Sequence, residues 1–191
     1  MAIAISYSGE QAFELHIPNT QLYAAYEILN SAGEDFGLPH FGMYAIDSMR
    51  LEKGYGHWKA DFITEFNPIE AGLERFVDLN KDFPGKEGLL AQTEAGYRKL
   101  RVVLAIDSND APTQPGEGVF HKGIAVGSIT SASWGYRTHQ NLAMAYVDAN
   151  YAAENIELEV FIFGKTVKAR ACKLCLYDPL NFVSRGVSSV I

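Results

Sequence analysis

The sequence predicts an α+β fold, in which a mixed α/β layer is followed by a small antiparallel β-barrel or jelly roll. Residues 1–95 carry helical and strand patterns without the strict alternation that a parallel sheet needs. From Arg98 onward, short runs alternate between apolar and polar residues and are separated by turn residues, as in small all-β domains. We therefore expect two domains, 1–95 and 96–191.

The first domain is expected to open with a β-hairpin over residues 2–18, because apolar residues alternate on both sides of Ser8-Gly9-Glu10-Gln11. A helix should follow, capped by Asn19 or Thr20 and ended near Gly33. Its apolar stripe is predicted to hold Leu22, Tyr26 and Leu29.

A second helix is predicted to end at Lys53-Gly54, where a basic last turn precedes a glycine suited to the left-handed conformation. Asp47 and Arg50 are expected to form an ion pair on the helix surface or between the domains. The apolar face of this helix should hold three residues spaced three apart: Met43, Ile46 and Met49.

Three more elements complete the first domain. Asn67-Pro68-Ile69-Glu70 combines a capping Asn, a Pro at the first helical position and an acid in the first turn, and so predicts a helix start. A strand over residues 75–79 and a helix from Phe83 through about Gln92 should follow.

In the second domain, the alternating pattern predicts strands interrupted by a turn-rich loop over residues 107–118. Gly164-Lys165 is predicted to form a type II′ hairpin turn, since Gly comes first. The predicted strands are 100–106, 123–131, 141–147, 156–163 and 166–171.

Composition narrows the class of protein. A net charge of −7 argues against a nucleic-acid partner or an anionic membrane surface, because both need a basic face. No apolar run reaches the ~18–20 residues of a membrane span, and the first residues lack the basic start of a secretory signal. We expect a soluble, cytoplasmic protein. The glycine fingerprints that bind NAD, FAD or ATP are absent from the sequence.

The two cysteines, Cys172 and Cys175, have the spacing of a metal or redox motif. A zinc site would need further Cys or His residues at ligand spacing, and none is near in the sequence. We expect two separate, reduced thiols and no metal.

Two motifs carry a resemblance. Leu-Glu-Lys-Gly-Tyr-Gly-His-Trp at 51–58 and Asn-Pro-Ile-Glu-Ala-Gly-Leu at 67–73 resemble the folate-binding aminomethyltransferase family. That family includes the glycine-cleavage T-protein and the C-terminal halves of sarcosine and dimethylglycine dehydrogenases. The His-Trp pair and Ile46, which stands where the T-protein branch has Arg, are more similar to the dehydrogenase branch. Segments 124–137, 141–147 and 177–181 resemble the family's C-terminal barrel.

The resemblance implies tetrahydrofolate as cofactor and transfer of a one-carbon unit to it from a methylated glycine or an aminomethyl donor. It also implies that the family pattern starts upstream of Met1, so the first half of the folate site and any FAD-binding portion would lie outside this chain. The expected partners are folate and the missing N-terminal half or a dehydrogenase subunit. We assign no catalytic residue, and whether this chain is itself an enzyme stays open. The alternative is a non-catalytic scaffold or docking module.

The resemblance also implies binding residues. Tyr7 and Glu14 match the family's Tyr-x-Gly-Glu-x-x-x-Glu motif, so Tyr7 would pack on the folate and Glu14 would bond to its pterin edge. Alternatively, Tyr7 fills the core and Glu14 is a solvated strand charge. His57 and Trp58 either border the folate channel or pack in a tight loop. Arg137 and Arg185 either meet the folate glutamate tail or are solvated.

Overall fold

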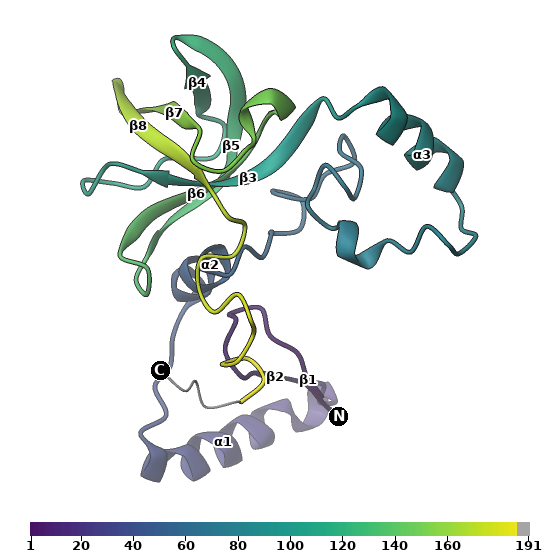
Figure 1. Cartoon of the computed structure of the whole chain (residues 1–191). Helices are drawn as coiled ribbons and strands as arrows, with labels where there is room; N and C mark the ends of the chain where they lie inside the picture. The colour runs from purple at the N-terminus through teal and green to yellow at the C-terminus, as the bar shows by residue number, and fades with distance from the viewer. Residues whose placement is uncertain (187–191) are drawn as a thin grey trace.

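The computed structural model describes residues 1–186 and confirms the predicted α+β class (Figure 1). Its main feature is a closed barrel in the order β3-β6-β5-β4-β7-β8, with every neighbouring pair antiparallel. The strands are β3 Lys99–Ile106, β4 Gly118–His121, β5 Ile124–Gly135, β6 Gln140–Asp148, β7 Glu157–Ile162 and β8 Lys165–Cys172. The division into domains 1–95 and 96–191 stays a prediction, and residues 187–191 lie outside the described part.

The barrel holds the main hydrophobic core. Inward side chains from all six strands, such as Leu104, Val119 and Val160, are fully buried. A second, smaller cluster lies on the outer face of β3 and β6, where α2 covers the barrel. It contains Leu51, Val103, Leu142 and Met144. This outer cluster is therefore where the first part of the chain packs against the barrel.

The predicted strands are present, with two corrections. Gly118–His121 forms β4, although the sequence analysis placed no strand there. The β7–β8 turn is Phe163-Gly164, because Ile162 pairs with Lys165. Both turn residues have positive φ, +46° and +81°, which is the type I′ pattern, so the type II′ prediction is wrong.

The first part of the chain contains one short hairpin and three α-helices, joined by turns and irregular segments. The hairpin prediction is confirmed in a shorter form, since β1 Ala2–Ala4 pairs with β2 Phe13–Leu15. The three confirmed helices are α1 Leu22–Gly33, α2 Met43–Glu52 and α3 Lys86–Ala95. Neither Asn19 nor Thr20 caps α1, because Asn19–Gln21 forms a 3-10 turn and Gln21 is the N-cap without a side-chain bond.

The predicted apolar face of α2 is wrong. Met43 is 66% exposed, whereas Ser48, Arg50, Leu51 and Glu52 are buried. The helix therefore packs on the barrel mainly through charged and polar side chains. The predicted C-terminus is confirmed, since Gly54 has φ +75°.

The Asn67 cap forms, but the predicted helix does not. The Asn67 Oδ1 accepts hydrogen bonds from the backbone N–H groups of Ile69 and Glu70, at 2.9 Å each. After one turn, Arg101 donates to the carbonyls of Glu70 and Ala71, which a longer helix would use itself. The predicted strand at 75–79 is also wrong, because a 3-10 turn, Glu74–Phe76, occupies its start.

Residues 173–186 return from β8 along α2 toward the hairpin (Figure 1). The backbone N–H groups of Leu176 and Tyr177 both donate to the carbonyl of Glu52, at 3.0 Å. The Lys53 Nζ lies 3.0 Å from a carboxylate oxygen of Asp178, and both side chains are almost fully buried. This C-terminal segment therefore fastens the end of α2 to the barrel.

Helix α1 does not contribute to a hydrophobic core. Figure 1 shows α1 at the end of the molecule far from the barrel, and none of its residues is buried. Within residues 1–186, no helix has the length and apolar character needed to cross a membrane.

Candidate functional site

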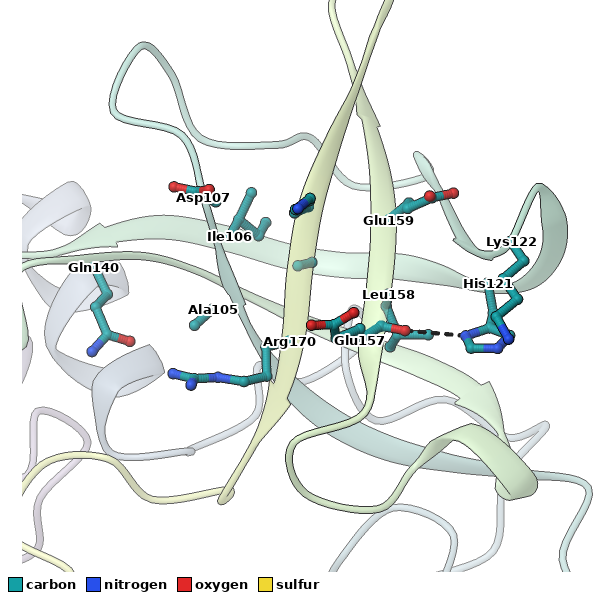
Figure 2. A pocket seen from close by; sticks show the side chains of 12 residues that line it. Ala105, Ile106, Asp107, His121, Lys122, Gln140, Glu157, Leu158, Glu159 and Arg170 are labelled. Carbon is teal, nitrogen blue, oxygen red and sulfur yellow. Dashed lines mark hydrogen bonds between the residues drawn. The ribbon is translucent and has the colours of Figure 1, made fainter.

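One hollow, of about 500 Å³, lies on the outer wall of the barrel (Figure 2). Charges of both signs from adjacent strands line it, since Glu157 pairs in register with Arg170 and Glu159 with Lys168. No residue with a predicted site role is among the described residues that line it. With no excess of one sign of charge, it offers an anionic ligand little selective attraction.

A second hollow, of about 480 Å³, lies between the hairpin segment and the C-terminal segment. We call it the arginine hollow, because Arg75 and Arg185 both line it and no Asp or Glu among the described residues does. Gln11 and Phe13, from the 7–14 motif, line the same space, as does Tyr55. Two guanidinium groups without a lining carboxylate favour an anionic group such as a carboxylate.

The structure thus places Arg185 beside the motif segment, although the two are far apart in sequence. Arg75 was not predicted as a binding residue, because the sequence pattern placed it in a strand. The sequence signal for Arg75 was its position as a basic residue soon after the Glu70-Ala71-Gly72-Leu73 stretch.

Tyr7 lies at the edge of the 54–62 loop and is partly exposed. Its hydroxyl donates a hydrogen bond to the carbonyl of Gly56 at 3.4 Å. Burial raises the pKa of the Tyr7 phenol, the nearby charge of Arg50 lowers it, and the charges of Asp61 and Asp47 raise it further. Tyr7 is therefore close to a group of buried charges beneath this loop.

Glu14 lies elsewhere on the hairpin. It is exposed and within 3.5 Å of His16 Nε2. Successive residues of a strand point to opposite faces, so Glu14 points away from the face on which Phe13 lines the arginine hollow. The contacts of Tyr7 and Glu14 lead to different neighbours, and their shared folate role stays a prediction.

His57 and Trp58 are exposed, Trp58 by 72%. The loop that carries them is nevertheless closed by hydrogen bonds, since the carbonyl of His57 accepts from the backbone N–H groups of Ala60, Asp61 and Phe62. An exposed aromatic ring on a well-fixed loop is suited to stack on a planar ligand.

Arg137 is engaged by the protein itself. Its Nε donates to Glu52 Oε2 at 2.6 Å and its Nη1 to Glu10 Oε1 at 2.5 Å, and the guanidinium lies 3.9 Å from the centre of the Tyr177 ring. Burial lowers the pKa of Arg137, but the bonds and charges of Glu52 and Glu10 outweigh it, so the pKa is raised. These contacts join the motif segment to α2, and a role at the folate tail stays a prediction.

Asp61, which the sequence analysis missed, is the most extensively bonded carboxylate of the region. It is fully buried, and its Oδ2 accepts from Arg50 Nη1 at 2.8 Å and from the His57 backbone N–H at 2.7 Å. The predicted Asp47–Arg50 ion pair forms, with Arg50 Nε 3.2 Å from Asp47 Oδ1. Arg50 is 3% exposed and also donates to Ser131 of β5, so its guanidinium lies between α2 and the barrel. No local pattern could reveal Asp61, since its partners Thr130 and Ser131 are about 70 residues away.

Tyr146 contacts the backbone of the same residue. Its hydroxyl donates to the backbone carbonyl of Asp61 at 2.9 Å. Burial raises the pKa of the Tyr146 phenol to about 12, against a lowering effect of Arg101. Burial likewise lowers the pKa of the Arg101 guanidinium, which the charge of Asp61 partly offsets.

The raised pKa predicts a loss of stability at high pH. The folded state keeps the Tyr146 proton up to a pH of about 12, whereas the unfolded chain releases it near 10. This contribution is therefore complete below pH 10 and declines as pH rises toward 12, by up to about 2–3 kcal/mol. Urea unfolding at pH 9 and pH 11 should show a smaller decline in Tyr146→Phe than in the parent chain. An equal fall in unfolding free energy in the variant and in the parent chain would contradict the raised pKa of Tyr146.

The two thiols are separate. Cys172 Sγ lies 3.5 Å from the carbonyl of Arg170, and Cys175 Sγ lies 3.1 Å from that of Tyr177. Burial raises the pKa of the Cys175 thiol. In the part of the chain that the structure describes, no group of three or more His, Cys, Asp or Glu side chains is arranged to hold a metal ion.

Comparison with known proteins shows that two domain families match this chain. Residues 1–81 match the GCVT N-terminal domain, and residues 98–178 match the glycine cleavage T-protein C-terminal barrel domain. The crystal structure of glycine cleavage system aminomethyltransferase T from Bartonella henselae is similar, with a TM-score of 0.83 and 26% identity. The alignment covers 93% of this chain and 50% of that one.

Curated relatives come from two groups of enzymes. The mitochondrial dimethylglycine dehydrogenase of Mus musculus is 38% identical over 88% of the chain, and the mitochondrial sarcosine dehydrogenase of the same species is 34% identical over 97%. The aminomethyltransferase of Moorella thermoacetica is 37% identical over 90%. The matches span 20% and 21% of the two dehydrogenases and 47% of the aminomethyltransferase. A cytoplasmic location stays a prediction.

Proposed function

We propose, since the chain belongs to the glycine cleavage T-protein family, that it takes part in one-carbon transfer to tetrahydrofolate by forming one wall of the folate site. The parent reaction would move a one-carbon unit from a methylated glycine or an aminomethyl donor. The relatives are named as aminomethyltransferases and as dehydrogenases of two methylated glycines, which supports this class of reaction.

The observation that carries the proposal is the arginine hollow. Folate ends in a glutamate tail with carboxylate groups, and Arg75 and Arg185 supply two guanidinium groups without a competing carboxylate in the described lining. Residues of the 7–14 motif line the same hollow. A ligand whose tail lay there would have its ring system close to Tyr7 and the 54–62 loop, because Tyr55 lines the hollow and Tyr7 bonds to Gly56.

The role of these residues would be to bind and to orient. Tyr7 and Trp58 offer aromatic faces to the pterin ring, while His57 and Arg185 offer polar contacts. Glu14 lies on the other face of the hairpin, so its contact with the pterin would need a different approach of the ligand. Bound tetrahydrofolate would supply the acceptor for the one-carbon unit. Among residues 1–186 we assign no catalytic acid or base, since the polar groups that are buried here already bond to one another.

One side of the proposed folate wall is exposed to solvent. Many apolar side chains of the first 58 residues are exposed, which indicates that another protein surface covers them. They include Ile5, Phe13, Leu22, Tyr23, Tyr26, Ile28, Leu29, Phe36, Phe41, Met43, Tyr44 and Trp58. The chain also spans only 47% of the length of the Moorella thermoacetica aminomethyltransferase and 50% of the Bartonella henselae protein. We therefore propose that residues outside this sequence complete the folate site.

The same exposed surface favours a second candidate function, docking onto a dehydrogenase partner without a role in catalysis. The two functions differ in one respect, because only the first requires the arginine hollow to bind a ligand.

Tetrahydrofolate binding tests the proposal. An open pocket leaves the polar contacts in competition with water, at about 0.5–1.5 kcal/mol each, so the chain alone should bind at millimolar concentration or more weakly. Calorimetry should show micromolar binding when the unmatched part of the Moorella thermoacetica protein is added in trans. Arg185→Ala should weaken that binding about tenfold, and Arg170→Ala, in the barrel-wall hollow, should leave it unchanged. Assembly of the two parts without folate binding would favour the docking function.

A further inference from the structure

The barrel side of Asp61 contains an irregularity in β5. Ile129 pairs with Ala145 and Ser131 with Met144, so Thr130 is an extra residue in the strand, a β-bulge. In a regular strand the side chains of Thr130 and Ser131 would point to opposite faces. Here both hydroxyl groups donate to the same carboxylate, at 2.5 Å from Thr130 and 2.7 Å from Ser131 to Asp61 Oδ1.

The strand resumes its normal alternation on either side of the bulge. Ile129 belongs to the barrel core, and Ala132 packs against that core. The bulge therefore turns a second hydroxyl group outward without moving the apolar residues next to it. Bulges commonly re-aim a side chain in this way.

The loop side of Asp61 is bonded equally well. Its Oδ2 accepts from the backbone N–H of His57 at 2.7 Å, and its own N–H donates to the carbonyl of His57 at 2.9 Å. The next residue back, Gly56, accepts the hydroxyl of Tyr7. One carboxylate thus connects the barrel hydroxyls to the backbone that supports Tyr7, His57 and Trp58.

Stability alone does not account for this arrangement. A buried ion pair such as Arg50–Asp61 carries a desolvation penalty that apolar residues of similar size would avoid. Directional bonds from a strand to a loop backbone do something that apolar packing cannot, because they fix where the loop lies.

We infer that Thr130, Ser131 and Asp61 form a latch that sets the position of the 54–62 loop on the barrel. Asp61 is then a positioning residue for the ligand wall made by Tyr7, His57 and Trp58. The inference rests on the proposed function for the identity of that ligand. The position of the loop can be measured without any ligand.

The test uses the 191-residue chain and the double variant Thr130→Val/Ser131→Ala, which removes both hydroxyl groups. The variant also removes the Ser131 acceptor of Arg50 Nη1, but it keeps the Arg50–Asp61 pair. The matched control is Thr166→Val/Ser133→Ala. Thr166 is exposed on β8, and the Ser133 hydroxyl has one long bond of 3.5 Å to the carbonyl of Trp134. Amide hydrogen exchange measured by NMR reports directly on the His57 N–H that bonds to Asp61.

We expect the latch variant to speed exchange of the His57 amide about tenfold or more, with the core amides of Val103 and Leu104 changed less than twofold. The control should change neither the exchange of His57 nor that of the core amides.

In the assembled protein, the latch variant should also weaken tetrahydrofolate binding about three- to tenfold. Unchanged His57 exchange would overturn the latch, as would equal acceleration of His57 and the core amides. Faster His57 exchange with undiminished folate binding would overturn the positioning role. If the parent assembly binds no folate, the proposed function fails, and the exchange of His57 alone decides the latch.

Discussion

Replacing Glu52 with Ala should lower the free energy of unfolding by about 3–5 kcal/mol, because it removes one partner of a buried ion pair. Glu52 is fully buried. Its carboxylate accepts bonds from the backbone N–H groups of Arg137 and Thr138, at 2.7 Å each, and from the Arg137 side chain at 2.6 Å. Without it, these three N–H groups and the Thr138 hydroxyl lose the Glu52 acceptor, and among the described residues the Arg137 guanidinium keeps only Glu10 as an acidic partner.

Urea unfolding of Glu52→Ala and the parent chain measures this loss. Glu52→Gln, which keeps an acceptor oxygen, should lose less than Glu52→Ala. Glu154→Ala is the matched control, because Glu154 is exposed and should change stability by less than about 0.5 kcal/mol. A loss of under 1 kcal/mol in Glu52→Ala would show that this network does not hold α2 on the barrel.

Gly54→Ala should be the second large effect, with a loss of about 2–4 kcal/mol. Gly54 has φ +75°, a conformation that costs any side chain free energy. An added Cβ would also lie 2.0 Å from the carbonyl oxygen of Leu174, so the C-terminal segment would have to move away from α2.

Gly88→Ala provides the contrast for this substitution. Gly88 lies within α3, has no heavy atom within 4 Å of the added Cβ and has an ordinary φ. The same change should therefore stabilise the chain by about 0.5–1 kcal/mol. Thermal unfolding of both variants compares them directly, and a Gly54→Ala variant that is as stable as the parent chain would contradict the packing described for Gly54.

The barrel could be predicted from sequence because strands such as β7 and β8 bury alternate residues. β4 was missed because four residues are too few to show a period. The Asn67 cap was read correctly, but the helix that it predicted is ended by Arg101, about 30 residues away. Local sequence signals thus predicted where this turn begins, whereas a tertiary contact determined where it ends.

The candidate site shows the same limit. The family motif located the segment that holds Tyr7 and Glu14, and the resemblance also selected Arg185. Arg75 and Asp61 could not be selected, because their importance comes from neighbours that the fold brings together. The bulge at Thr130 has no sequence signature, since Ser and Thr are common in strands and only the pairing with β6 reveals the extra residue.

The most direct test of the proposed folate wall is the location of the ligand. An air-stable tetrahydrofolate derivative, titrated to millimolar concentration into the 191-residue chain, can be followed by NMR chemical shifts for each backbone amide. We expect the largest shifts at residues 11–13, 55–58 and 181–185, which surround the arginine hollow and the adjoining loop. Shifts centred on the barrel-wall hollow of Figure 2, around His121, Glu157 and Arg170, would contradict the account.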